Sequence, residues 1–102
     1  MKKIVDGKIY DTATAERIAE RKSGYGRGDF NWCEETLYRT KKGNWFLAGQ
    51  GGAMSRYAQS SGDYKTISLD IFPVTQEEAV DWLKEHAPDK LEKCFPNLFT
   101  EA

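Results

Sequence analysis

Near the amino terminus, two short apolar pairs lie on either side of an Asp-Gly dipeptide. Ile4-Val5 precedes Asp6-Gly7, and Ile9-Tyr10 follows it after one lysine. Asp-Gly suits the two-residue turn of a β-hairpin, because both central residues of a type I′ turn take a positive φ. The pattern therefore predicts a hairpin over residues 4–10.

The next segment carries its apolar residues at helical spacing. Ala15, Ile18 and Ala19 recur at intervals of three and four residues, which places them on one face of a helix. Asp11-Thr12 supplies an N-cap, and Gly24 is suited to the left-handed position after a helix end. These signals predict a helix over residues 12–22.

Alternation with a period of two then favours a second hairpin. Residues 35–40 and 45–49 are predicted as its strands, and residues 41–44, with two lysines, a glycine and an asparagine, as its turn. Trp45 and Phe46 are adjacent, so a pleated strand turns them to opposite faces. We expect one of them to lie under a helix or at a contact surface.

Farther along, Ile67, Leu69 and Ile71 alternate with polar residues, which predicts a strand over residues 66–72. Pro73 is expected to close this strand. A short helix is predicted before it, over residues 53–58.

Thr75 and Glu78 have the spacing of a capping box, which predicts a helix that starts after Thr75. Ala79, Trp82, Leu83 and His86 fall along one face of that helix. Ala87-Pro88 is expected to end it, with one or two further turns over residues 89–95.

Together these elements predict an α+β fold, in which a small antiparallel sheet (two hairpins plus one further strand) packs against two main helices. The chain has 102 residues and shows no repeat or linker. We therefore expect a single domain over residues 1–102, with residues 87–102 as a C-terminal extension.

Composition narrows the class of protein. No apolar stretch approaches the roughly 20 residues that span a bilayer, and the first residues show no segment of signal-peptide length. We therefore expect a cytoplasmic protein with no membrane partner. The formal net charge of −1 argues against a globally basic nucleic-acid binder.

Reactive side chains are few. Cys33 and Cys94 are the only cysteines and His86 is the only histidine, too few for a structural zinc site. The two thiols are expected to be free and mostly buried. No Walker loop, HExxH or GxSxG motif is present. We therefore predict no enzyme, and no catalytic, cofactor-binding or metal-binding residue.

Charge is distributed unevenly along the chain. Residues 1–53 carry a balance of +3 and residues 54–102 a balance of −4. The acidic excess is concentrated on the last helical region and predicts a negative stripe made of Glu77, Glu78, Asp81, Glu85, Asp89 and Glu92. Such a stripe is either an ordinary solvated face or a surface that meets a basic groove on another protein.

A glycine-rich stretch over residues 24–29 is a second contact candidate. It carries Tyr25, Arg27 and Asp29. Tyrosine and arginine are enriched at binding hot spots, so these three residues are predicted to contact a partner.

Four blocks of the sequence carry a family resemblance. They are DGKIYDTATA (6–15), ETLYRTKKGNWFL (35–47), GQGGAMSRYA (49–58) and PVTQEEAVDWL (73–83). Together they resemble a family of short proteins carried by phages and other mobile elements of Gram-positive bacteria. The resemblance covers most of residues 4–86, and the tail from Ala87 on lies outside it.

The resemblance implies an anti-defence role, and anti-CRISPR proteins are the best-known group of that kind. The leading hypothesis is an inhibitor that binds a host CRISPR–Cas effector in the cytoplasm without catalysis. Either the acidic helix, through Glu77, Asp81 and Glu85, occupies a basic nucleic-acid channel, or the loop with Tyr25 and Arg27 docks on a protein surface.

Two alternatives remain open at this point. One is a small nucleic-acid-binding module that uses the cations Arg39, Lys41 and Lys42 with the aromatics Tyr38 and Trp45 on a sheet face. The other is a self-associating structural or virion accessory protein.

Overall fold

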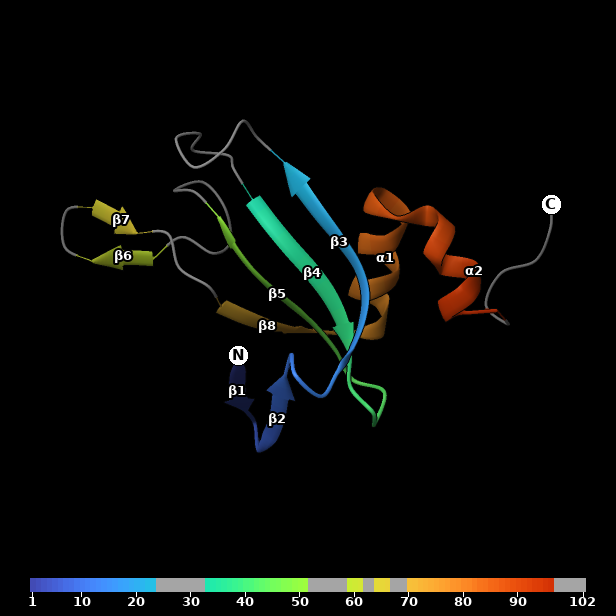
Figure 1. The fold of residues 1–102 in the computed structure, drawn as a ribbon, viewed down its shortest axis with the longest axis horizontal. Helices are drawn as coiled ribbons and strands as arrows, with labels where there is room; N and C mark the ends of the chain where they lie inside the picture. Colours follow the sequence, from blue (N-terminus) through green and yellow to red (C-terminus); the bar gives the residue numbers. More distant parts are fainter. Residues whose placement is uncertain (24–32, 52–58, 62–63, 67–69, 97–102) are drawn as a thin grey trace.

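The centre of the molecule is a four-stranded antiparallel sheet with helices on one face (Figure 1). The computed structural model describes residues 1–23, 33–51, 59–61, 64–66 and 70–96. The sheet has the order β3-β4-β5-β8, and its strands are β3 (Glu16–Ser23), β4 (Cys33–Arg39), β5 (Trp45–Gly51) and β8 (Asp70–Val74). The predicted α+β class, with a small antiparallel sheet packed against helices, is confirmed.

The predicted first hairpin is also present. Strands β1 (Lys2–Val5) and β2 (Lys8–Asp11) pair antiparallel, with Ile4 opposite Ile9. Asp6 and Gly7 form the turn with φ values of 51° and 76°. Both signs are those a type I′ turn requires, which is why the Asp-Gly dipeptide located this turn correctly.

The helix predicted over residues 12–22 is wrong, because residues 12–15 form a turn and the strand β3 begins at Glu16. The register of β3 against β4 slips between Arg17 and Ala19, which indicates a β-bulge at Ile18. The bulge lets the adjacent Ile18 and Ala19 both pack on the helix side of the sheet, whereas Ala15 packs on the opposite side. The extra residue at the bulge therefore gives Ala15, Ile18 and Ala19 the spacing that is typical of one helix face, although the segment from Glu16 on is a strand.

The second hairpin forms as predicted from β4 and β5. Thr40 donates its backbone N–H to the oxygen of Asn44 at 2.7 Å, and Gly43 has a φ of 88° in the turn. Trp45 and Phe46 lie on opposite faces of β5, each almost completely buried. Phe46 is therefore covered from the hairpin side, and Trp45 lies under the helices.

The strand predicted over residues 66–72 is placed differently. Thr66 ends β7 (Tyr64–Thr66), which pairs with β6 (Gln59–Ser61), and residues 67–69 lie outside the described residues. The last sheet strand, β8, starts at Asp70 and continues through Pro73. Proline is accommodated because β8 is at the sheet edge, where, among the strands that the structure describes, one side has no partner strand. The helix predicted over residues 53–58 lies outside the described part of the chain.

The capping box correctly located helix α1 (Gln76–His86). Glu78 donates its backbone N–H to Thr75 Oγ1, and Thr75 donates its own to Glu78 Oε1, both at 3.1 Å. After Ala87 the chain continues in a 3₁₀ turn, η1 (Pro88–Lys90), and a short helix, α2 (Leu91–Cys94). The predicted end of the helix at Ala87-Pro88 and the predicted further turns after it are therefore confirmed.

The apolar side chains form two clusters, one on each face of the sheet. The helix-side cluster joins Leu37, Trp45 and Leu47 to residues of α1, and Phe95 stacks on Trp45 with 5.3 Å between ring centroids. The hairpin-side cluster joins the sheet to Tyr10 of β2, the ring of which meets Phe46 edge-on. The sheet thus separates the helices from the β1–β2 hairpin.

Candidate functional site

Helix α1 has a buried face and an acidic face. Ala79, Val80, Trp82 and Leu83 are buried against the sheet. At 100° per residue, Glu77, Asp81 and Glu85 point to the opposite side, and all three are exposed. The sequence prediction of a solvent-facing acidic stripe is therefore correct for these residues, as it is for the exposed Glu78, Asp89 and Glu92.

The acidic face carries little internal compensation. Glu77, Asp81 and Glu85 follow one another at intervals of four, a spacing at which like charges destabilise a helix by about 0.2–0.5 kcal/mol per pair. Within the described residues, Glu77 and Asp81 form no ion pair, and Glu85 lies 3.7 Å from the ring of His86. The helix thus presents concentrated negative charge to solvent.

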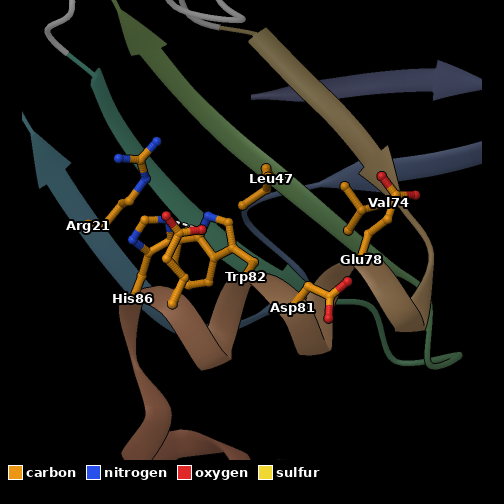
Figure 2. Close-up of a pocket in the computed structure, with 8 residues that line it drawn as sticks. Arg21, Leu47, Val74, Glu78, Asp81, Trp82 and His86 are labelled. Atoms are coloured by element: carbon orange, nitrogen blue, oxygen red, sulfur yellow. Dashed lines mark ion pairs between the residues drawn. The ribbon is translucent and has the colours of Figure 1, made fainter.

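A cavity of about 450 Å³ lies beside this face, between α1 and the sheet (Figure 2). Three carboxylates line it, from Glu78, Asp81 and Glu85. Arg21, Trp82 and His86 gather at one end of the cavity, whereas Asp81 and Glu78 lie toward the other. The rings of Trp82 and His86 pack edge to face, with 5.1 Å between their centroids.

The buried carboxylate of Glu35 fixes the positions of Arg21 and Trp82 at this end of the cavity. The side chain of Glu35, on β4, has no exposed surface, and its Oε1 accepts hydrogen bonds from Arg21 Nε at 2.7 Å and from Trp82 Nε1 at 2.8 Å. Burial by itself lowers the pKa of Arg21, but the hydrogen bond and charge of Glu35 outweigh it and raise that pKa. The three side chains join β3, β4 and α1.

Sequence reasoning missed the role of Glu35. The available signal was its place between Cys33 and Leu37, two apolar residues on the same side of β4. Its partners Arg21 and Trp82 are 14 and 47 residues away along the chain. The local pattern therefore indicated a buried position without indicating what neutralises the charge.

Gly49 lies opposite Glu35 on β5 and permits this arrangement. A Cβ at position 49 would lie 2.2 Å from the backbone oxygen of Glu34 and 2.9 Å from Cβ of Glu35. Both contacts are far too short for any side chain. The close approach of β4 and β5 at the buried carboxylate therefore depends on glycine.

The residues of the predicted nucleic-acid surface are divided between the two faces of the sheet. Tyr38 stacks on Phe46 on the hairpin side, with a centroid distance of 5.1 Å and an interplanar angle of 8°. Trp45 is 4% exposed on the helix side, with the Arg39 guanidinium 5.4 Å from its ring centroid. Arg39 also donates to Glu16 at 2.8 Å. Tyr38 and Trp45 therefore do not form one stacking platform.

A basic groove nevertheless exists at the β4–β5 turn. Lys8, Lys41 and Lys42 line a cavity of about 450 Å³ together with Gly7, Ile9, Thr14, Thr40 and Asn44. None of its lining residues is a carboxylate. This groove concentrates positive charge outside the acidic α1 face.

The remaining predicted residues have simple outcomes. Tyr25, Arg27 and Asp29 lie outside the described residues. Cys33 and Cys94 do not form a disulfide; Cys33 is buried and Cys94 half-buried. Burial raises the pKa of the Cys94 thiol. Over the described ranges, no group of three or more His, Cys, Asp or Glu side chains is arranged to hold a metal ion, and no helix is both long and apolar enough to cross a bilayer.

No protein-family model matches the chain, and no curated protein or solved structure matches it at a significant level.

Proposed function

We propose that this protein acts by binding rather than by catalysis, and that the acidic outer face of α1 occupies a basic, nucleic-acid-binding surface of a larger protein. The observation that carries the proposal is the exposed series Glu77, Asp81 and Glu85 on the side of the helix opposite its buried face. Regularly spaced carboxylates on a helix present negative charge to a groove that otherwise holds phosphates.

The support beneath the helix favours a docking role. Its position is held by the capping box at Thr75 and by the hydrogen bond from Trp82 to buried Glu35. A rigid charged face loses little conformational freedom on binding, so more of its interaction energy appears as affinity.

The resemblance to short phage and mobile-element proteins supplies the class of target. We infer that the partner is a host defence protein, with a CRISPR–Cas effector as the first candidate, and that inhibition takes place in the bacterial cytoplasm. The inhibitor would bind the effector and exclude nucleic acid from it.

Two matched charge reversals test the proposal. Asp81→Lys/Glu85→Lys changes the charge of the α1 face by four units, and Asp89→Lys/Glu92→Lys makes the same change on the η1–α2 segment. Binding to purified Cas effectors is measured by interferometry and inhibition by target cleavage. We expect the α1 variant to bind roughly tenfold more weakly or worse, since about 1.4 kcal/mol of lost charge contact is tenfold in affinity.

The control variant is expected to retain most of the affinity. Circular dichroism establishes that both variants keep their helices. Inhibition that is equally strong in the α1 variant would exclude the acidic helix as the docking surface.

The basic groove favours a second candidate function, binding of single-stranded nucleic acid. Lys8, Lys41 and Lys42 converge there without a lining carboxylate. Fluorescence anisotropy with a labelled oligonucleotide at low salt tests it, with Lys41→Glu/Lys42→Glu as the variant. Binding that weakens steeply with salt and is lost in the variant would support this function, and no binding at low salt would remove it.

A further inference from the structure

The β1–β2 hairpin exposes an apolar pair to solvent. Ile4 and Ile9 are direct cross-strand partners and are 67% and 60% exposed. Apart from Met1, they are the only large hydrophobic residues that are exposed in the part of the chain the structure describes. The two side chains are neighbours across the strand pair, and a contiguous exposed apolar patch marks an interaction site.

The hairpin has two different faces. Val5 and Tyr10 turn toward the sheet and join the hairpin-side cluster, and Lys3 on the same face reaches Asp70 of β8 at 3.0 Å. Because side chains alternate along a strand, Ile4 and Ile9 point the other way. The outer face of the hairpin therefore consists of Lys2, Ile4, Ile9 and Asp11.

This outer face is complementary to itself. Lys2 is the cross-strand partner of Asp11, and Ile4 is the partner of Ile9. A twofold axis parallel to the strands places β1 of one copy over β2 of the other. It brings Ile4 onto the partner's Ile9 and Lys2 onto the partner's Asp11, so that each apolar residue meets an apolar one and each charge meets its opposite.

We propose that the outer face of the β1–β2 hairpin binds a second copy of this chain in that twofold arrangement. The charges on the face favour this occupant over others. The outer face itself carries one lysine and one aspartate, a pair that the same face of a second copy matches. An acidic partner protein would repel Asp11, and a basic one would repel Lys2. Ile9 also borders the cavity lined by Lys8, Lys41 and Lys42, so vesicles of phosphatidylserine and an oligonucleotide, which require an excess of cations, are included in the test as competing ligands.

Expected affinity follows from size. The face spans two four-residue strands, less than the roughly 800 Å² per partner of a standard interface. We therefore expect association with a dissociation constant on the order of 0.1–1 mM, which is stronger wherever local concentration is high.

The pairing leaves α1 free. The hairpin and α1 pack on opposite faces of the sheet, so each dimer presents two acidic helices that point away from the contact. This inference does not depend on the identity of the target, because self-association is measured with the pure protein.

Sedimentation velocity of the full chain tests the contact. Protein concentrations from about 10 μM to 1 mM cover the dissociation constant that we expect for so small an interface. We expect the weight-average mass to rise with concentration toward that of two chains. Ile4→Thr/Ile9→Thr keeps β-branched residues on the strands but removes apolar surface, and is expected to remain monomeric. The control Lys93→Ala, at an exposed position of α2 on the other side of the sheet, is expected to behave like the parent protein.

A charge exchange tests the arrangement itself. Lys2→Glu and Asp11→Lys each place like charges opposite one another in a homodimer, and each alone is expected to associate more weakly than the parent. An equimolar mixture of the two variants restores opposite charges and is expected to recover association. Amide NMR spectra verify that the hairpin is intact in every variant.

Several outcomes overturn the proposal. One is a parent protein that keeps the mass of one chain at 1 mM. Another is association that Ile4→Thr/Ile9→Thr leaves unchanged. A third is a monomer whose Ile4 and Ile9 signals shift only with vesicles of phosphatidylserine or with an oligonucleotide, which would assign the face to those ligands instead.

Discussion

The indole Nε1 of Trp82 donates a hydrogen bond to the buried carboxylate of Glu35 at 2.8 Å, which joins helix α1 to the middle of strand β4. Arg21 on β3 shares the same carboxylate oxygen. A buried charge is costly unless its hydrogen bonds and counter-charge are all in place. Correct packing of α1 and correct strand pairing are therefore needed together, which gives this triad a role in selecting one arrangement of the fold.

Replacement of Glu35 by alanine is expected to destabilise the protein by about 2–4 kcal/mol, because it leaves the Trp82 donor unsatisfied and removes the counter-charge of Arg21. Urea unfolding followed by tryptophan fluorescence measures the change. The matched control is Glu34→Ala, which removes a half-buried carboxylate one residue earlier on the opposite face and is expected to cost less than about 1 kcal/mol. Equal losses in the two variants would contradict the role assigned to Glu35.

At Gly49, alanine is expected to destabilise the sheet by about 2 kcal/mol or more, because its Cβ would overlap the backbone of β4. Gly43, in the β4–β5 turn, provides the contrast. It has open space around it and a φ of +88°, a conformation that asparagine tolerates well. We therefore expect Gly43→Asn to cost under about 1 kcal/mol and Gly49→Asn to fold poorly. Thermal unfolding separates the two cases.

At the start of α1, Thr75→Ala is expected to lower the free energy of unfolding by about 1 kcal/mol, because the N–H of Glu78 loses its acceptor. Thr75→Ser keeps the hydroxyl and is expected to restore nearly all of the loss. Hydrogen exchange at the first turn of α1 should accelerate in the alanine variant alone. Similar exchange in both variants would show that the helix start is held by packing rather than by the capping box.

The raised pKa of Cys94 leads to a pH prediction. Burial is its largest cause, and it favours the neutral thiol in the folded state. The folded protein therefore retains this proton when the unfolded chain has lost it, so the contribution to stability is present below the unfolded pKa and is lost as the pH rises through the folded pKa.

Alkylation of Cys94 by iodoacetamide in a Cys33→Ala background should accordingly show its midpoint at a higher pH in the native protein than in urea. Mass spectrometry after timed quenching gives the rate at each pH. A native midpoint equal to or below that of the unfolded chain would contradict the shift.

Two local sequence signals located their elements correctly. The Asp6-Gly7 turn and the Thr75–Glu78 capping box each involve residues within a few positions of one another. The exposed side of α1 followed equally well from its helical period. The acidic candidate surface was therefore accessible from the pattern alone.

Two features depend on contacts between distant segments, and the sequence did not reveal them. The apolar spacing in β3 predicts a helix because a bulge at Ile18 shifts the alternation of the strand, and the pairing of β3 with β4 outweighs this local spacing. The role of Glu35 is the other such feature. Its counter-ion and its indole donor become neighbours only when β3 and α1 are in place.

Pro73 in the edge strand β8 has a consequence for how the protein behaves in a crowded solution. An unpaired edge invites an extended segment of another molecule to add itself to the sheet, which is one route to aggregation. Proline has no amide hydrogen to offer such a segment, and its ring obstructs close approach. On the β8 side, Pro73 thus limits uncontrolled growth of the sheet, together with Lys3, which donates to the backbone oxygen of Ile71 at 3.2 Å.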